Sequence, residues 1–232
     1  MNTGAELSFS QELRAAADPI WQAQHDHPFV QQIGRGSVDV ECFKRWVRQD
    51  YLFLIEYCRL LALAAARAPD LSTLRHFAEV LQETAVTEMD LHRSYATQLD
   101  ITDEELESEE MSPVTRSYTD FLLRTAALGD FGELAAALLP CMWGFNEIGL
   151  HLAARGRPAD SRYAQWIDAY ANPEFTRLAA WCRHLVDELA ADAGPGLRGR
   201  MRQAFLLSSR YELLFWDVSD QAVGASGDRQ DC

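Results

Sequence analysis

Three residues that could do chemistry lie far apart in the chain, each in an apolar segment with helical periodicity. Cys141 follows Pro140, which removes one helical hydrogen bond and so predicts a bend beside the thiol. Asp50 and Glu212 each lie among aromatic residues at spacings of three and four. Desolvating a carboxylate in such a stripe costs free energy unless something compensates. We therefore predict a polar pocket inside a helical bundle, formed by one thiol and two acids.

Each of these residues taken singly has a simpler structural explanation. A cysteine beside a kink is usually a small core residue. A single acid can pair with an arginine, or its stripe can be turned toward water. Three such residues, each centred on an apolar face of a different helix, favour the pocket. The stripe around Asp50 consists of Phe43, Trp46, Phe53, Leu54, Tyr57 and Leu61, and that around Glu212 of Phe205, Ser208, Phe215 and Trp216.

The composition is that of an acidic helical protein with a substantial core. The chain has 232 residues, 48% of them hydrophobic, and a formal net charge of −14. Its richness in Ala, Leu, Glu and Arg favours helices. The negative charge argues against nucleic acid and anionic membranes as partners. The longest apolar stretch, 134–145, is shorter than the ~20 residues that span a bilayer, and no secretory signal is evident at the N-terminus.

The cysteines are odd in number, scattered, and without a C-x-x-C pair. This pattern predicts free thiols in a reducing cytoplasm and argues against a disulfide framework or a zinc site. The five are Cys42, Cys58, Cys141, Cys182 and Cys232.

Capping residues, prolines and glycines divide the chain into helices with short connections. Ser8 or Ser10 should cap a first helix that bends at Pro19, Ser37 should cap the second long helix, and Asp70 should start the third. We expect one compact all-α domain over 1–223 and a polar, frayed tail over 224–232. The expected helices lie at about 8–24, 38–67, 70–99, 113–128, 130–155, 160–171, 172–193 and 198–219, with a short piece within 27–36 and a short exposed acidic helix within 103–110.

Several motifs occur in one order between about residue 9 and residue 219. They are His27-Pro28-Phe29-Val30, Trp46-x-x-Gln49-Asp50-Tyr51, Leu139-Pro140-Cys141-x-Trp143-x-x-x-Glu147-Ile148-Gly149, Tyr163-x-x-Trp166-Ile167-x-x-Tyr170 and Tyr211-Glu212-x-x-Phe215-Trp216. Together these motifs resemble the TenA family (thiaminase II, aminopyrimidine aminohydrolase). The resemblance implies a haem-oxygenase-like single-domain helical bundle, a cytoplasmic homotetramer, a small aminopyrimidine as substrate, and no cofactor.

The resemblance also implies roles for individual residues. The reaction would release 4-amino-5-hydroxymethyl-2-methylpyrimidine from aminomethylpyrimidine, and also from thiamin. Cys141 matches the nucleophile, Glu212 the acid/base at a ring nitrogen, and Asp50 the carboxylate that binds the aminopyrimidine edge. The implied pocket residues are Tyr118 and Tyr170, the rings Phe53 and Phe145 at positions where the family commonly has tyrosines, and Trp216.

Two other functions stay open on the sequence alone. Glu88 and His92 lie one helical turn apart, as metal ligands do in di-iron bundles, and would be the basis of a metal-dependent haem-oxygenase-like oxidase. A non-catalytic member that binds a pyrimidine or a partner protein is the second alternative. A Cys–His catalytic pair is also open, because spatial neighbours cannot be read from the sequence.

Overall fold

The computed structural model describes residues 7–219, and over that range the chain is helical, with no strand. No helix there is both long and apolar enough to cross a membrane. The elements are α1 (Phe9–Ala16), α2 (Asp18–Asp26), α3 (Pro28–Arg35), α4 (Val40–Arg67), α5 (Leu71–Glu83), the π-helical segment η1 (Thr84–Glu88), α6 (Met89–Gln98), α7 (Asp103–Ser108), α8 (Pro113–Leu128), α9 (Phe131–Ala154), α10 (Ser161–Ala171), α11 (Pro173–Ala191), α12 (Pro195–Trp216) and the 3₁₀ turn η2 (Asp217–Ser219).

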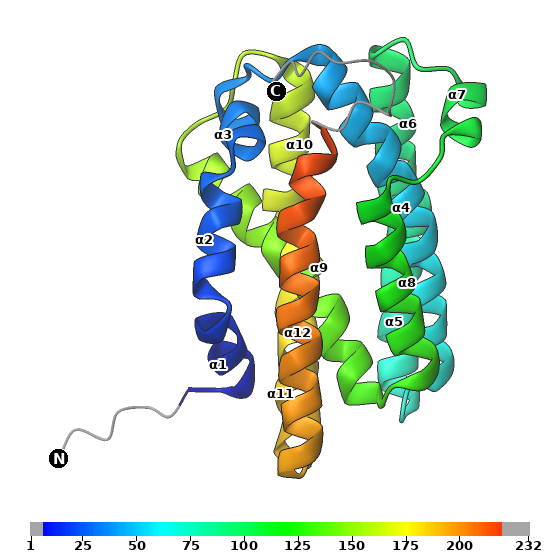
Figure 1. Ribbon diagram of the computed structural model, residues 1–232, viewed down its shortest axis with the longest axis vertical. Helices are drawn as coiled ribbons and strands as arrows, with labels where there is room; N and C mark the ends of the chain where they lie inside the picture. The colour runs from blue at the N-terminus through cyan, green and yellow to red at the C-terminus, as the bar shows by residue number, and fades with distance from the viewer. Residues whose placement is uncertain (1–6, 220–232) are drawn as a thin grey trace, which may run out of the picture.

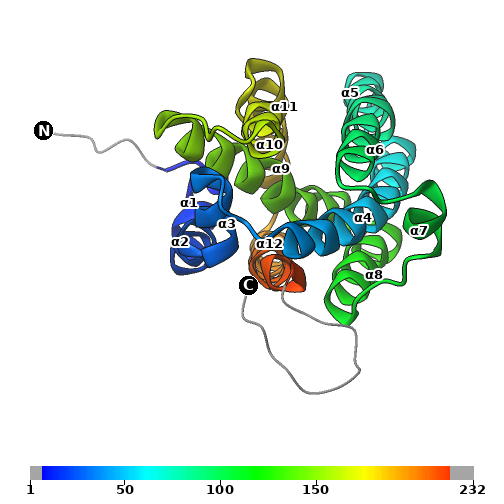
Figure 2. The same cartoon turned by 90° about the horizontal axis from the view of Figure 1, so that it is seen from above.

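Helices α9 and α12 form the middle of the bundle. α9 packs against α8, α10, α11 and α12, while α4 packs against α5, α6 and α8 and also touches α9. α4, α8 and α12 run roughly along the long axis (Figure 1). Seen from above, α1–α3 lie on one side of α12 and α4–α8 on the other (Figure 2). This arrangement brings α4, α9 and α12, the three helices expected to carry the pocket, into one core.

The predicted inward stripes are buried. Around Asp50 the stripe residues of α4 are all at most 4% exposed, and Asp50 itself is 3% exposed. Glu212 is 2% exposed among the buried residues of α12. Aromatic rings fill the space between the two helices, and Trp46 of α4 stacks on Trp216 of α12 with centroids 6.0 Å apart. Burial of these rings supplies much of the hydrophobic stabilisation of the bundle.

Most predicted helix starts are confirmed, because the capping side chains bind the exposed backbone N–H groups. Ser8 forms a capping box with Gln11, and Asp70 accepts from the N–H of Thr73. Ser37 is not the cap of α4. Asp39 has that role and accepts from two first-turn N–H groups, because Gly36, at φ 68°, first has to end α3 in the left-handed conformation.

Two predicted helices are interrupted. The expected helix at 8–24 is two helices that break at Ala17, because Pro19 lacks an N–H and fits best in the first turn of a new helix. The expected helix at 70–99 contains the π-helical segment η1, which no proline or glycine announces. By contrast, α9 stays helical through Pro140. The predicted tail at 224–232 lies outside the described residues.

The prediction that all cysteines are free is wrong at one position. Cys58, Cys141 and Cys182 carry free thiols, whereas Cys42 is disulfide-bonded. Pairing requires two cysteine Cα atoms to come within about 7 Å, and sequence spacing alone does not reveal which cysteines do so.

Candidate active site

A narrow cavity with about 310 Å³ of atom-free space lies where α4, η1, α9, α10 and α11 meet. Its wall is mostly aromatic and aliphatic, with three groups that could do chemistry: two carboxyls and one thiol. Such an apolar cavity with a few converging polar groups is the usual form of a small-molecule site. The lining residues are Asp50, Phe53, Leu54 and Tyr57 of α4, Glu88 of η1, Cys141, Met142 and Phe145 of α9, Tyr170 of α10 and Phe175 of α11.

Cys141 presents its thiol to this cavity from the middle of α9, directly after Pro140. The thiol makes hydrogen bonds with Glu212 and also lies near the hydroxyl of Tyr57. Burial, followed by the nearby carboxylates, raises the pKa of Cys141 well above its usual value. The resting residue is therefore a protonated thiol, and it needs a proton acceptor when it reacts.

Glu212 is held behind the thiol by a short chain of hydroxyls. Tyr118 donates to its carboxyl at 2.5 Å, and the same hydroxyl is 2.9 Å from the Oγ of Ser208. Burial raises the pKa of Glu212 to about 8, with a further contribution from the charge of Asp50. Glu212 is consequently protonated at neutral pH and can act as a proton donor.

Asp50 is paired with a histidine that comes from another helix. The Nε2 of His92 on α6 lies 2.6 Å from Oδ2 of Asp50, and its Nδ1 donates to the backbone carbonyl of Glu88 at 2.9 Å. Burial disfavours the imidazolium, but the hydrogen bond and charge of Asp50 outweigh it and raise the pKa of His92. His92 thus holds one oxygen of Asp50, and the other oxygen remains to accept a hydrogen bond from a ligand.

The same geometry bears on the metal alternative. Both ring nitrogens of His92 already make hydrogen bonds, so neither is available as a metal ligand. Within residues 7–219, no three His, Cys, Asp or Glu side chains are grouped so that they could hold a metal ion. The spacing of Glu88 and His92 therefore has a different meaning, since His92 orients Asp50 and Glu88 lines the cavity.

Glu88 and Tyr57 are polar cavity residues to which the sequence interpretation gave no role at a substrate pocket. Tyr170 donates to Oε1 of Glu88 at 3.0 Å, and burial raises the pKa of this glutamate to about 7. The hydroxyl of Tyr57 is buried without a hydrogen-bond partner of ordinary geometry among the described residues. A buried polar atom without a partner costs free energy and commonly marks a functional site.

The predicted ring contacts divide into two groups. Phe53, Phe145 and Tyr170 line the cavity, as does Phe175. Tyr118 and Trp216 are not among the lining residues. Tyr118 stacks on Phe53 at 5.1 Å and holds Glu212, while Trp216 packs behind Phe145 at 5.2 Å. Both support the wall from behind.

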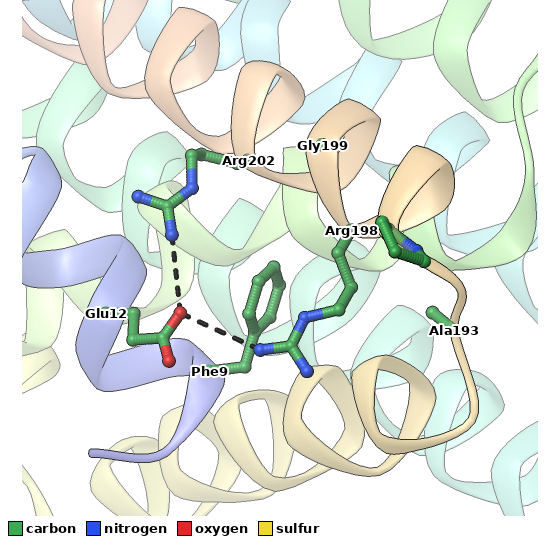
Figure 3. Close-up of a pocket in the computed structure, with 7 residues that line it drawn as sticks. Phe9, Glu12, Ala193, Arg198, Gly199 and Arg202 are labelled. Carbon is green, nitrogen blue, oxygen red and sulfur yellow. Dashed lines mark hydrogen bonds and ion pairs between the residues drawn. The ribbon is translucent and has the colours of Figure 1, made fainter. Parts of the chain in front are cut away.

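A second cavity lies at the surface between α1 and the start of α12 (Figure 3). Its two arginines, Arg198 and Arg202, both pair with Glu12 at 3.7 and 3.3 Å, and Arg198 also lies over the ring of Phe9. It contains no thiol, and its charged groups already have partners. We therefore place the candidate active site in the cavity of Cys141.

Comparisons with known proteins bear on the family and the fold. The model of the TENA/THI-4/PQQC family matches residues 14–222. An aminopyrimidine aminohydrolase of Halalkalibacterium halodurans is 42% identical over 92% of this chain and 96% of its own. An aminopyrimidine aminohydrolase of Bacillus subtilis is 36% identical over 95% of this chain and 93% of its own.

Solved structures match over the same extent. A TenA homologue from P. horikoshii OT3 superposes with a TM-score of 0.84 at 29% identity, covering 92% of this chain and 98% of its own. A domain from Shewanella denitrificans with a heme oxygenase-like fold gives a TM-score of 0.71 at 14% identity and covers 90% of each chain, which bears on the fold alone. The predicted haem-oxygenase-like all-α fold is confirmed.

Proposed function

Because the chain belongs to the TENA/THI-4/PQQC family, we propose that it is an aminopyrimidine aminohydrolase of thiamin salvage. It would convert aminomethylpyrimidine and water to hydroxymethylpyrimidine and ammonia, and it would act on thiamin in the same way. The observation that carries the proposal is the thiol of Cys141 in one small cavity with Asp50, backed by a protonated Glu212.

The polar groups suit the two edges of an aminopyrimidine. Asp50, oriented by His92, would accept a hydrogen bond from the exocyclic ring amine. Glu212, protonated at neutral pH, would donate to a ring nitrogen. Phe53 and Phe145 are placed to pack against the flat ring from the cavity wall. Tyr118 and Trp216 would act one layer further out, by holding Glu212 and Phe145 in place.

The proposed chemistry begins with proton transfer from Glu212 to the ring nitrogen, which makes the ring electrophilic. The sulfur of Cys141 then adds to a ring carbon, and its proton passes to the carboxylate that Glu212 has become. This relay supplies the base that a thiol of raised pKa requires. The hydroxyl of Tyr57, which lies near the sulfur and has no other partner, would stabilise the negative charge as it develops.

The adduct would then expel the amine from the exocyclic methylene as the ring electrons shift toward that carbon. Water adds to the methylene and gives up one proton to solvent, which balances the proton that leaves with the ammonia, and the ring then expels the sulfur. Glu212 returns its proton to the sulfur and takes back the proton of the ring nitrogen, so the enzyme returns to its starting state. The net change is the replacement of an amino group by a hydroxyl group.

We also propose that residues 1–223 act as one domain and that the protein is a homotetramer in the cytoplasm, without a cofactor, a nucleic acid or a membrane as partner. These statements rest on the family resemblance and, for nucleic acid and membrane, on the net charge of −14. Light scattering of the purified protein would measure the assembly directly.

The experiment that tests the function is incubation of the protein with aminomethylpyrimidine and, separately, with thiamin. Chromatography would follow release of hydroxymethylpyrimidine. We expect turnover by the wild type and a loss of roughly 10³-fold or more in Cys141→Ser, which should still bind the pyrimidine. Full activity in Cys141→Ser would contradict the role of Cys141 as the nucleophile. If the wild type released no hydroxymethylpyrimidine from either compound, the proposed function would be contradicted.

A further inference from the structure

Glu88 lines the same cavity as Cys141, and the reaction described above does not use it. It ends the π-helical segment η1, an irregularity of a type often found at functional sites. Its side chain is half-buried, lines the cavity and accepts a hydrogen bond from Tyr170. Partial burial of a carboxyl group costs free energy of desolvation, and acids kept in such positions often belong to functional sites.

The two oxygens of Glu88 differ in their contacts. Oε1 accepts from the hydroxyl of Tyr170 at 3.0 Å. Oε2 accepts no hydrogen bond from any residue within 7–219. The nearby imidazole of His92 is bound to Asp50 instead. The cavity thus offers one carboxylate oxygen that has no donor within 7–219 and that can accept a hydrogen bond from a ligand.

Glu88 and Glu212 are positioned for different parts of a substrate. Glu212 comes from α12, is held by Tyr118 and contacts the thiol from behind the cavity wall. Glu88 comes from η1, is held by Tyr170 and faces the open space itself. If Glu212 and Asp50 bind the edge of the pyrimidine ring, Glu88 is free to bind the aminomethyl group attached to the ring.

We propose that Glu88 binds the amino group that leaves and keeps its proton on it during departure. This inference rests on the proposed function. In the leaving step the carbon–nitrogen bond breaks, both electrons go to nitrogen, and neutral ammonia departs only if nitrogen already carries three hydrogens. If Glu88 is a carboxylate, it stabilises the aminomethyl group of the substrate as an ammonium. If Glu88 is a carboxylic acid, it donates the missing proton to a neutral amine.

Thiamin, the other proposed substrate, has a leaving group that differs from the amine of aminomethylpyrimidine. The thiazolium of thiamin leaves as a neutral thiazole, takes the bonding electrons to its own cationic nitrogen and needs no proton. Glu88 would therefore matter for an amine leaving group and matter much less for a thiazolium. It would be a specificity-determining residue as well as a catalytic one.

Binding to a variant without the nucleophile tests the contact without relying on turnover. Calorimetry would measure aminomethylpyrimidine and hydroxymethylpyrimidine with Cys141→Ser and with Cys141→Ser/Glu88→Gln. We expect the second substitution to weaken the amine about 10-fold or more and to leave the alcohol within about twofold. The alcohol serves as the control for an intact cavity. Equal losses for both pyrimidines, or no loss for either, would overturn the proposal.

Kinetics give a second measurement. In Glu88→Gln, kcat for aminomethylpyrimidine should fall about 100-fold or more, while kcat for thiamin falls much less. A parallel fall for both substrates would contradict the assignment to the leaving group. If Cys141→Ser binds neither pyrimidine, the proposed function fails at the outset, and that result is distinct from a failure of Glu88 alone.

Discussion

At the scale of single residues, burial decides which acid carries a proton. Glu212 and Glu88 have raised pKa values because the core desolvates them, whereas Asp50 has a hydrogen bond with His92. The site thus contains a proton donor and a hydrogen-bond acceptor of the same chemical type. Their environments separate their roles, as in other enzymes that use two carboxyl groups.

The pH dependence of turnover follows from Glu212. Its raised pKa means that the acid form is present below about 8 and is lost as the pH rises through that value, so kcat should decline there. Glu212→Gln should lower kcat by about 10²–10⁴-fold and remove this decline. Rates measured across the pH range in both proteins check it. A wild-type rate that stays level well above this pKa would count against the donor role.

The meeting of Asp50, Cys141 and Glu212 near one point could be predicted, because each lies on the phase of its helix that the apolar residues mark as inward. The pairing of Asp50 with His92 could not, since the two are 42 positions apart and no periodicity links them. For the same reason the spacing of Glu88 and His92 suggests only a metal site when the sequence is read alone. The packing of α6 against α4 shows instead that His92 bonds to Asp50.

At the scale of helices, caps were the most informative signals, and irregular turns the least. Aspartates and serines marked most starts correctly, but Ser37 and Asp39 compete two residues apart, and the end of α3 decides between them. No residue pattern in the sequence indicates the π-helical segment. This segment matters for the site because it places Glu88 in the cavity wall.

The close packing of α9 and α10 rests on a glycine. A Cβ at Gly149 would come within 2.8 Å of the backbone and side chain of Tyr170, whereas a Cβ at Gly144 on the same helix would meet nothing within 4 Å. Gly149→Ala should therefore displace α10 and cost about 1–3 kcal/mol of stability. It should also lower turnover, because Tyr170 lines the site.

Gly144→Ala is the matched control. It should leave the free energy of unfolding unchanged or raise it by about 0.5–1 kcal/mol, because alanine is the better helix former. Urea denaturation of both variants measures the difference. Equal stability of the two would mean that the approach of α9 to α10 imposes no steric demand at position 149.

At the scale of the whole molecule, a partly buried ionic contact joins the N-terminal helices to α9. Glu147 accepts from Arg14 at 2.7 Å and lies 3.1 Å from the Nε2 of His25. Partial burial alone would raise the pKa of Glu147, but the hydrogen bonds from His25 and Arg14 outweigh it and lower the value to about 2. The predicted motif residue Glu147 is thus structural.

The stability that this contact contributes should depend on pH. A lowered pKa means that the contribution is complete above the ordinary glutamate value of 4.5 and is lost as the pH falls toward about 2. Glu147→Gln should lower the free energy of unfolding by about 2 kcal/mol at neutral pH and by much less in acid.

Glu174→Gln is the control. Because Glu174 is in an exposed pair with Arg177, this substitution should lower the free energy of unfolding by less than about 1 kcal/mol. Urea unfolding at both pH values measures this, and a difference that persists in acid would contradict it.

The central claim is that an aminopyrimidine ring binds in the cavity between Cys141 and Asp50. A crystal structure of Cys141→Ser with aminomethylpyrimidine tests it most directly. We expect the ring between Phe53 and Phe145, its amine on Asp50, a ring nitrogen within hydrogen-bond distance of Glu212, and the introduced hydroxyl facing a ring carbon. A ring found instead in the surface cleft of Phe9 and Arg198, with the cavity of position 141 unchanged, would contradict the account.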